Sequence, residues 1–477
     1  MKKMPNNKHR LAFFLVLVLG LMVDHASLRA NDSPESTETN PPNIVLILSD
    51  DQAWNDFGFM GHETIQTPNL DRLANESLTF KRGYVPTSLC CPSLATIITG
   101  HYPSQHYVTG NDPLVPATLK GKQKRRELFL ELDQKIDARI ESAATLPRLL
   151  ATRGYTSFQS GKWWHGSFAT GGFSEGMTHG DPSRGGRHGD QGLSIGRQGL
   201  QPIFDFIDGA EEEEKPFFVW YAPFLPHTPH NPPERLLRKY QAEGRPIELA
   251  KYYAMCEWFD ETCGQLIDHV DNRGLAEQTL FVFVTDNGWI QATSKTDLPE
   301  KWNKKFAPNS KQSPSDGGIR TPIMLRWKGK IEPWTDANGL ASSIDLAPTI
   351  LAAAGVDIPG SMTGQSLLDV SEQNPVRREA IFGEIFAHDI ADVDDPSKSL
   401  LYRWCIDGQY KLILHYDGMT GRNKSIHQFM QGDRSPELYD IVADPFEETD
   451  LAETDPTRVA ELAEKIEARF KDLPIGN

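Results

Sequence analysis

Cysteine is scarce in this chain, which holds five in 477 residues. Two of them, Cys256 and Cys263, lie in a segment whose apolar spacing predicts a helix, and helix rise would place them about 10 Å apart. A disulfide needs Cα atoms within about 7 Å of each other. The odd number also leaves one cysteine without a partner. We therefore expect few or no disulfides and a core that is held together by packing.

Basic charge is also in deficit. The chain has 49 Lys and Arg against 65 Asp and Glu, which gives a formal net charge of −16. Such a chain has no general attraction for nucleic acid or for an anionic membrane surface, so non-specific binding of either is excluded as a function. It would also repel an anionic substrate at long range. Any anion that it binds must therefore meet a locally positive pocket.

Long apolar runs are missing as well, apart from one near the start, at 11–23. This run follows basic residues and precedes small ones, and it is too short to span a bilayer comfortably. It predicts a signal peptide over residues 1–30, followed by a polar, disordered lead-in over 31–42. A short membrane anchor is the alternative, because Leu28 is a poor residue three positions before a cut after Ala30. We expect export to the periplasm or the medium, with no stable membrane span once the signal is removed.

The chain does contain a regular alternation of apolar runs and amphipathic segments. The runs 43–48, 217–222 and 279–285 are continuous, as in strands buried on both faces of a parallel sheet, whereas 246–273 shows helical spacing. Thr67 and Pro68 mark the start of another helix, expected to reach Leu78 with Thr67 as its cap. This alternation predicts an α/β fold over residues 43–370, with a large, mainly parallel sheet sandwiched by helices.

The pattern changes after about residue 370. Two β-type runs flank an Asp407-Gly408 turn, a short strand is expected at 437–440, and a closing helix at 457–471. These features predict a smaller C-terminal antiparallel β subdomain over 371–477. Earlier in the chain, the charged stretch 120–141 predicts a helix that is exposed to solvent.

Acidic and amide side chains follow two of the predicted strands. Asp50 and Asp51 come after 43–48, and Asp286 and Asn287 after 279–285. Loops at the carboxyl ends of parallel strands gather in one crevice. Either pair alone would more often cap a turn, but four oxygen ligands in one crevice suit Ca²⁺ or Mg²⁺. We therefore predict a metal site there.

A cysteine stands where a loop is expected to enter a helix. Cys90 precedes Cys91-Pro92 and an apolar helical turn at 95–98. The unpaired N–H groups of a helix start favour an anion, so a reactive Cys90 could meet an anionic substrate there. A Cys-Cys-Pro sequence by itself is more often a packed turn with inert, buried thiols.

Four further side chains could supply positive charge. Lys162 follows a predicted strand, His227 lies in a Pro-His-Thr-Pro sequence, and Lys311 precedes Asp316-Gly-Gly. Each alone would be taken for a surface lysine or a structural histidine, but together they make the locally positive pocket that an acidic chain needs for an anion. His165 is the fourth candidate, although a lone histidine is often structural.

Together these motifs resemble those of the formylglycine-dependent sulfatases, the type I sulfatases of the alkaline phosphatase superfamily, over roughly residues 42 to 450. The family signature is Cys-x-Pro-Ser-Arg, then a short helix and Thr-Gly. This chain matches it at Cys90, Pro92, Ser93 and Thr99-Gly100. Leu94 stands where the family usually has Arg, a residue that helps the modifying enzyme recognise the motif.

The resemblance implies a sulfuric ester hydrolase in which Cys90 is converted to formylglycine by a transiently bound formylglycine-generating enzyme. It implies one Ca²⁺, held by Asp50, Asp51, Asp286, Asn287 and the modified Cys90. It also implies that Lys162 and Lys311 hold the sulfate and that His227 protonates the leaving alcohol. Trp164 stands where the family has a His two positions after the Lys, and His165 is either the displaced equivalent of that His or an unrelated residue at the rim of the site.

Export and a long Gly-rich stretch at 171–199 favour a sulfated carbohydrate or polysaccharide as the substrate. Several polar side chains could contact its hydroxyl groups or a second sulfate, or could serve only as turn residues: His179, Arg184, Arg187, His188, His230 and Asn231. Arg320 matches an Arg of the family's Lys-to-Gly-Gly segment, where a structural role is as plausible as a functional one.

Two alternatives remain open because of Leu94. The chain could be a phosphodiesterase or a phosphonate monoester hydrolase of the same superfamily, using the same metal pocket. If Cys90 is never converted, the chain could instead be a non-catalytic binder of sulfated glycans.

Overall fold

A computed structural model describes residues 41–181, 188–299, 302, 305–376, 378–418 and 435–471. From Pro41 onward the chain forms one compact unit. The predicted signal peptide, most of the lead-in, Arg184 and Arg187 lie outside the described residues. None of the described helices is both long and apolar enough to cross a membrane.

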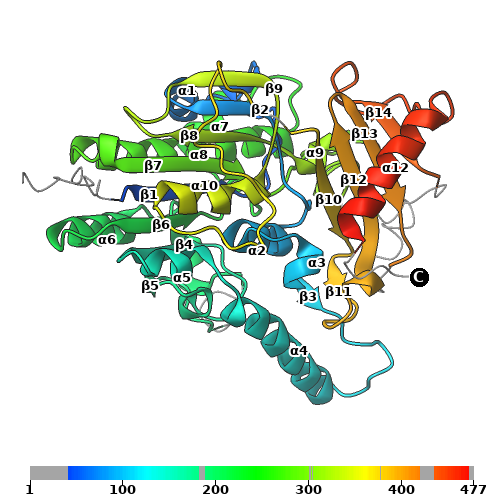
Figure 1. Ribbon diagram of the computed structural model, residues 1–477, viewed down its shortest axis with the longest axis horizontal. Helices are drawn as coiled ribbons and strands as arrows, with labels where there is room; N and C mark the ends of the chain where they lie inside the picture. Colours follow the sequence, from blue (N-terminus) through cyan, green and yellow to red (C-terminus); the bar gives the residue numbers. More distant parts are fainter. Residues whose placement is uncertain are drawn as a thin grey trace, which may run out of the picture. The chain divides into compact units, whose positions relative to one another are not determined.

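The larger sheet has eight strands in the order β5-β4-β6-β1-β7-β8-β2-β9 (Figure 1). Its strands are β1 (Asn43–Ser49), β2 (Leu78–Tyr84), β4 (Thr156–Gly161), β5 (Glu175–Gly176), β6 (Phe217–Ala222), β7 (Thr279–Thr285), β8 (Arg320–Arg326) and β9 (Trp334–Ser342). β8 runs antiparallel to both of its neighbours, and the other pairings are parallel. The prediction of a large, mainly parallel sheet is confirmed.

Helices cover both faces of this sheet. The helices are α1 (Pro68–Asn75), α2 (Cys90–Thr99), α3 (Pro103–His106), α4 (Lys122–Ser142), α5 (Leu146–Ala151), α6 (Gln201–Glu212), α7 (Glu234–Tyr240), α8 (Ile247–Asn272), α9 (Asp316–Ile319) and α10 (Leu346–Ala353). Short 3-10 helices lie at Gly58–Met60, Phe168–Gly171, Asp190–Ser194, Ala276–Gln278, Ser343–Asp345 and Pro396–Ser399.

β1 shows how the sheet separates two apolar cores. Successive side chains of a strand point to opposite faces. Ile44, Leu46 and Leu48 join a core with residues of α2, α5 and α10, whereas Val45 and Ile47 join a second core with residues of α1, α6 and α8. Because both faces are covered, every residue of β1 is buried, as its continuous apolar run predicts.

The start of α1 differs from the expectation. Within the described residues Thr67 makes no side-chain capping hydrogen bond, and the helix ends at Asn75 because β2 begins three residues later. The cap comes from α8 instead. Asp260 accepts hydrogen bonds from the backbone N–H groups of Asn69 (3.3 Å) and Leu70 (2.7 Å). Packing therefore replaces a local cap with a carboxylate about 190 residues away in sequence.

A smaller antiparallel sheet follows, in the order β10-β12-β13-β14. Its strands are β10 (Ala380–Phe386), β12 (Leu400–Asp407), β13 (Tyr410–His415) and β14 (Glu437–Asp440), and α12 (Pro456–Phe470) packs on it (Figure 1). Asp407 pairs with Tyr410, so Gly408-Gln409 forms the turn, one residue later than predicted, with Gly408 at φ +57°. A two-stranded ladder joins β3 (Asp112–Pro113) to β11 (Asp389–Ile390).

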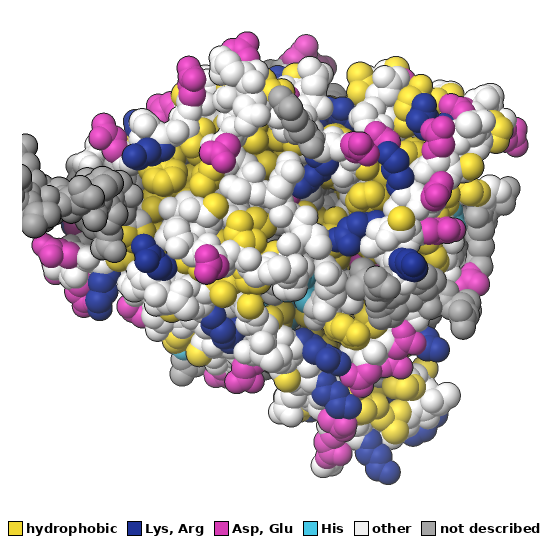
Figure 2. Space-filling view, viewed as in Figure 1, with side chains coloured by type: hydrophobic (Ala, Val, Ile, Leu, Met, Phe, Trp, Pro, Cys, Tyr) yellow, Lys and Arg dark blue, Asp and Glu magenta, His cyan; other side chains and the backbone are white. Residues whose placement is uncertain are grey.

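The charged segment and the cysteines behave as expected. α4 buries only Ile136 and Ile140, and over this helix basic and acidic side chains are interspersed (Figures 1 and 2). All five cysteines are buried and none of them forms a disulfide, so packing holds the core together.

Candidate active site

The two acidic pairs meet at the ends of neighbouring strands. β1 and β7 run parallel with Ser49 opposite Thr285, so the residues that follow them leave the sheet side by side. The Asp51 backbone N–H donates to Asp286 Oδ1 (3.2 Å), and Asn287 Nδ2 donates to Asp51 Oδ1 (2.8 Å). Asp51 turns the chain with φ +61°, a conformation in which aspartate is tolerated better than most residues. The crevice expected at the carboxyl ends of the strands is present.

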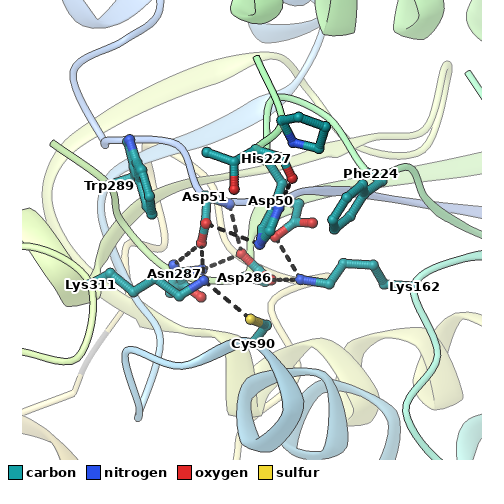
Figure 3. Close-up of polar contacts among 12 residues, drawn as sticks. Asp50, Asp51, Cys90, Lys162, Phe224, His227, Asp286, Asn287, Trp289 and Lys311 are labelled. Carbon is teal, nitrogen blue, oxygen red and sulfur yellow. Dashed lines mark hydrogen bonds and ion pairs between the residues drawn. The ribbon is translucent and has the colours of Figure 1, made fainter. Parts of the chain in front are cut away.

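Cys90 opens α2 and lies against this crevice (Figure 3). Lys311 Nζ donates to Asp51 Oδ1 (2.5 Å) and to Cys90 Sγ (3.3 Å), which places the lysine between the carboxylate and the thiol. Lys162, at the end of β4, donates to Asp50 Oδ1 (2.8 Å) and lies 3.9 Å from Asp286 Oδ2. Two ammonium groups therefore flank the start of the helix.

His227 completes the site from the loop after β6. Its Nε2 lies 3.4 Å from Asp51 Oδ2, and its Nδ1 lies 2.5 Å from the Thr228 carbonyl oxygen. Phe224 stacks on the imidazole, with ring centroids 4.2 Å apart. Arg197 holds the loop by donating to the carbonyl oxygens of Phe224 (2.7 Å) and His227 (3.0 Å).

Four buried oxygens in this crevice have no hydrogen-bond partner within the described part of the chain. They are Asp50 Oδ2, Asp51 Oδ2, Asp286 Oδ2 and Asn287 Oδ1. Buried polar atoms are normally paired, so such a cluster needs a ligand. Cys90 Sγ and carboxylate oxygens of Asp50 and Asp286 also lie within 4.8 Å of one another. Several carboxylate and amide oxygens are the donor set of a hard cation such as Ca²⁺, so these residues fit the metal that the sequence implied.

The buried charges of this crevice do not cancel. Three carboxylates (Asp50, Asp51 and Asp286) face two lysines (Lys162 and Lys311), which leaves an excess of negative charge. Burial would lower the pKa of Lys162 and of Lys311, but the carboxylates outweigh it and raise both, so both lysines are charged. Burial raises the pKa of Asp50 and of Asp286 against the attraction of Lys162.

Burial also acts on the pKa of three further groups of the site. It would raise the pKa of Asp51, but Lys311 and His227 outweigh it and hold that pKa below its ordinary value. It lowers the pKa of His227 against the attraction of Asp51. It raises the pKa of the Cys90 thiol despite the two lysines.

His165 lies beside this group, next to Cys91. Its Nε2 is 3.9 Å from Cys91 Sγ, and its Nδ1 is 3.6 Å from Asp137 Oδ1 on α4. Trp164 occupies the position two after Lys162, and its ring lies 5.8 Å from the lysine Nζ. The structure thus brings together every predicted site residue except His165, whose sulfur contact is with Cys91 in the first turn of α2.

The remaining polar candidates lie at the edges of the site or away from it. His188 stacks on Trp164 at 3.9 Å, and His230 contacts the rings of Tyr252 (5.4 Å) and Trp289 (6.3 Å). The other positions are as follows: the backbone N–H of His179 donates to Asp190 (2.8 Å), Asn231 accepts from Arg197, and Arg320 donates to the Lys81 carbonyl and covers the Trp54 ring at 3.9 Å.

Leu94 is 3% exposed and belongs to the apolar core on the α2 face of the sheet. It lies one helical turn after Cys90, on the same side of α2. The chain therefore places packed hydrocarbon where the signature has a guanidinium group. Near Cys90 the positive charge comes from Lys162 and Lys311.

Three residues of the site were not found from the sequence. They are Phe224 and Arg197, which support His227, and Trp289, whose ring centre lies 5.8 Å from Lys311 Nζ. Phe224 and Trp289 stand two or three residues from predicted site residues, and this proximity in sequence was the one feature that could have indicated them. Arg197 is a loop residue whose role depends on a contact across 30 positions of sequence.

A cavity of about 1120 Å³ opens beside the site. Its walls combine aromatic and polar side chains, among them Phe224, His227, His188, Gln291 and Thr293. Its volume is above the range of roughly 300–1,000 Å³ for small-molecule pockets, which leaves room for more than a sulfate ion beside His227.

Comparison with known proteins identifies relatives of both parts of the chain. A family model described as Sulfatase matches residues 42–356, and one described as N-sulphoglucosamine sulphohydrolase, C-terminal, matches residues 310–474. Arylsulfatase A of Homo sapiens is 30% identical over 368 residues, which cover 67% of this chain and 65% of that protein. N-acetylgalactosamine-6-sulfatase of Rattus norvegicus is 27% identical over 377 residues, covering 72% and 68%. The chain thus spans slightly less than two thirds of the length of arylsulfatase A.

The fold also matches solved structures. Ps i-CgsB in complex with k-i-k-neocarrahexaose has a TM-score of 0.66 at 20% identity, with 90% of this chain and 92% of that chain covered. The likeness therefore extends over the larger sheet and the smaller one.

Proposed function

Because the chain belongs to the sulfatase family, we propose that it is a sulfuric ester hydrolase that removes sulfate from a carbohydrate or polysaccharide. The observation that carries the proposal is the crevice in which four unpartnered oxygens and two buried lysines surround Cys90. The oxygens suit a cation, and the lysines suit an anion next to it. The relatives that act on sulfated sugars and the open cavity beside His227 support a carbohydrate as the alcohol part of the ester.

Two groups supplied from outside the chain complete this proposal. Asp50, Asp51, Asp286 and Asn287 would hold one Ca²⁺, which when bound stabilises negative charge on the sulfate. Formylglycine at position 90, made from Cys90 by a transiently bound formylglycine-generating enzyme, supplies a hydrated aldehyde whose two hydroxyls serve as nucleophile and as the group that expels sulfate.

The chain's own residues position the ester and handle the proton. Lys311 and Lys162 lie on two sides of position 90, where fixed cations stabilise charge that develops on the sulfate oxygens. The Thr228 carbonyl accepts from His227 Nδ1, which leaves Nε2 facing the crevice and Asp51. In the imidazolium form, which the negative charge of Asp51 stabilises, Nε2 carries the second proton and gives it to the leaving alcohol. Phe224 and Arg197 keep the imidazole in that orientation. His165, beside Cys91, is the second histidine of the proposal.

The proposal extends to the organisation of the chain. Residues 1–30 would direct export to the periplasm or the medium, 43–370 would form the catalytic domain, and 371–477 a subdomain whose sheet starts at Ala380. No nucleic acid is expected as a partner, which agrees with the net charge of −16.

Mass spectrometry of the peptide that contains Cys90 and Cys91 tests the central step. Conversion of a cysteine to formylglycine removes about 18 Da, and fragment ions must place the loss on Cys90 and not on Cys91. A Cys90→Ser variant, made in a host that modifies only cysteine, should lose turnover of a sulfate ester. Full activity of that variant would overturn the formylglycine mechanism.

The same assays separate the alternatives. Faster turnover of a phosphate diester than of the matching sulfate ester would identify a phosphodiesterase. An unmodified Cys90 in the native protein, with retained binding of a sulfated glycan and no turnover, would identify a binder.

A further inference from the structure

A second, smaller cavity lies beside the proposed sulfatase site. Its volume is about 260 Å³. Pockets for drug-sized ligands measure roughly 300–1,000 Å³, so this slightly smaller cavity suits a single ring of the size of a sugar. The loop after β1 and the turn after β14 both contribute to its wall, through Trp54 and Phe446. The proposed function does not use this cavity.

Several aromatic side chains line this cavity, and two of its large apolar side chains are exposed to solvent. Phe446 is 58% exposed and Ile290 is 38% exposed, and both line the cavity together with Trp54, Trp289 and Tyr253. Exposed large apolar groups gathered around one hollow mark a binding site more often than scattered ones do. Aromatic rings offer a flat, rigid face for the C–H side of a pyranose.

Polar groups also line this cavity, and the side chains of two of them make no hydrogen bond within the described part of the chain. The side-chain amides of Asn55 and Asn309 line it and make no hydrogen bond to another described residue. An amide both donates and accepts, which matches sugar hydroxyls. No Lys or Arg is among the described residues that line the cavity.

The two carboxyl groups at the cavity already bond to other groups of the protein. Asp56 accepts from Tyr252 Oη (2.5 Å) and from the Ala53 N–H (3.1 Å), and Glu447 accepts from the Asp316 N–H (2.9 Å) and pairs with Lys411. A wall with carboxyl groups and no lysine or arginine disfavours an anion. Because both carboxyl groups already bond to protein groups, the wall does not call for a cation either, and an uncharged occupant fits it.

The cavity adjoins the catalytic crevice. Trp289 forms part of its wall, and the centre of the same ring lies 5.8 Å from Lys311 Nζ. Gln291 lines both this cavity and the larger one beside His227. A glycan whose sulfated unit lies at Lys311 could place another unit here.

We propose that the cavity walled by Trp54, Trp289 and Phe446 is a subsite for an unsulfated pyranose unit of the glycan. The proposal rests on the proposed function only for the statement that this unit belongs to the substrate. Binding of the sugar itself depends on the aromatic wall and the two amides.

Saturation-transfer NMR on the full chain tests the subsite without any turnover. The probes are the methyl glycosides of galactose, glucose, N-acetylglucosamine and fucose. At least one should give a transfer signal with the wild type and with Val442→Ala, and the signal should be lost in Phe446→Ala. Val442 is the matched control, because it is 60% exposed on the same turn and lies outside the cavity wall. The subsite is refuted if none of the four probes gives a signal, or if Phe446→Ala retains it.

Kinetics test whether the substrate uses the subsite. The ratio of kcat/KM for a sulfated oligosaccharide to kcat/KM for 4-nitrophenyl sulfate should fall about fivefold in Phe446→Ala, as expected for the loss of one aromatic contact, and should not change in Val442→Ala. An unchanged ratio in Phe446→Ala would remove the subsite from the reaction. If neither substrate turns over while the transfer signal persists, the proposed function fails and the subsite stands.

Discussion

Two of the buried clusters of charged side chains in the described part of the chain differ in their charge balance. The active-site cluster consists of Asp50, Asp51, Asp286, Lys162 and Lys311, and carries three carboxylates against two lysines. The C-terminal cluster consists of Asp316, Glu447, Lys411 and Arg320, and carries two carboxylates against two cations.

The two clusters also differ in their hydrogen bonds. In the C-terminal cluster Lys411 Nζ donates to Asp316 Oδ1 (2.9 Å) and to the Pro314 carbonyl (3.1 Å), and it pairs with Glu447, whose other oxygen accepts from the Asp316 N–H. In the active-site cluster three carboxylate oxygens and the Asn287 carbonyl oxygen make no hydrogen bond to the described residues. In the C-terminal cluster Glu447 Oε1 alone makes none, and it is in close ion-pair contact with Lys411.

The difference separates a structural ion network from a binding site of the same composition. A network whose charges balance is complete without a ligand and stabilises what it joins, here strand β13 and the loop that carries Lys311. A network with excess negative charge and unpaired oxygens is complete only when a cation is bound. The comparison makes opposite predictions for substitutions in the two clusters.

The largest effect is expected from Lys411→Met. The change leaves Asp316 and Glu447 buried with Arg320 as the remaining cation, and breaking a buried pair costs about 3–5 kcal/mol. Urea unfolding should show this loss in the free energy of unfolding. Lys398→Met, at a lysine that is 62% exposed, is the control and should change little. A loss of less than about 1 kcal/mol for Lys411→Met would refute the structural role.

Asp286→Asn should change stability little but reduce activity strongly, in contrast to Lys411→Met. It removes one of three crowded carboxylates, so the free energy of unfolding in chelator should change by less than about 1 kcal/mol. The value of kcat/KM for a sulfate ester should fall about 10²- to 10³-fold, because charge stabilisation in the transition state is lost. Asp268→Asn, at an exposed aspartate paired with Arg72, is the control for both measurements. A stability loss as large as that of Lys411→Met would contradict the comparison.

Calcium should stabilise only through the active-site cluster. At a free concentration of one hundred times Kd, a cation that binds the folded state adds about 2.7 kcal/mol. Thermal unfolding in CaCl₂ and in EDTA should show this difference in the wild type and in Glu447→Gln, but not in Asp286→Asn. An equal shift in Asp286→Asn would place the ion elsewhere.

The smallest effect concerns pH. Burial, partly offset by Lys411, raises the pKa of Glu447 to about 7 from an ordinary value of 4.5. Between these values the folded state binds the proton more strongly than the unfolded state. The contribution of this group to stability is therefore fully present below pH 4.5 and is lost as the pH rises through 7.

The measurement is the free energy of unfolding against pH. Between pH 5 and 7 the wild type should lose up to about 1.4 kcal/mol per pH unit more than Glu447→Gln. Glu448→Gln, at the exposed neighbouring position, should follow the wild type. Parallel curves for the wild type and Glu447→Gln would show that Glu447 does not titrate in this range.

Much of the site was predictable because it depends on local sequence. A continuous apolar run such as 43–48 predicts a strand that is buried on both faces, and the parallel arrangement brings the residues after β1 and β7 together. Cys90 at the start of α2 follows from the loop and the apolar turn around it. These inferences need only the period of a strand or helix and the direction of its neighbours.

Other features could not be read from the chain in order. The Asp407-Gly408 turn moved by one residue because the register of β12 and β13 fixes its position. The cap of α1 comes from Asp260 and not from Thr67. The direction of β8, opposite to its neighbours, follows from pairings with β2 and β7, which lie far from it in sequence.

The sequence by itself determined which chemical groups are present and which strand and helix ends carry them: the two acidic pairs, Cys90, Lys162, His227 and Lys311. Only the tertiary structure decided which oxygens lack a partner and whether the charges balance, because the partners come from positions more than a hundred residues apart. A Lys beside two carboxyl groups is structural at Lys411 and part of a candidate site at Lys162. The two differ in how many oxygens and charges the surrounding packing leaves unpaired, and local sequence does not contain that count.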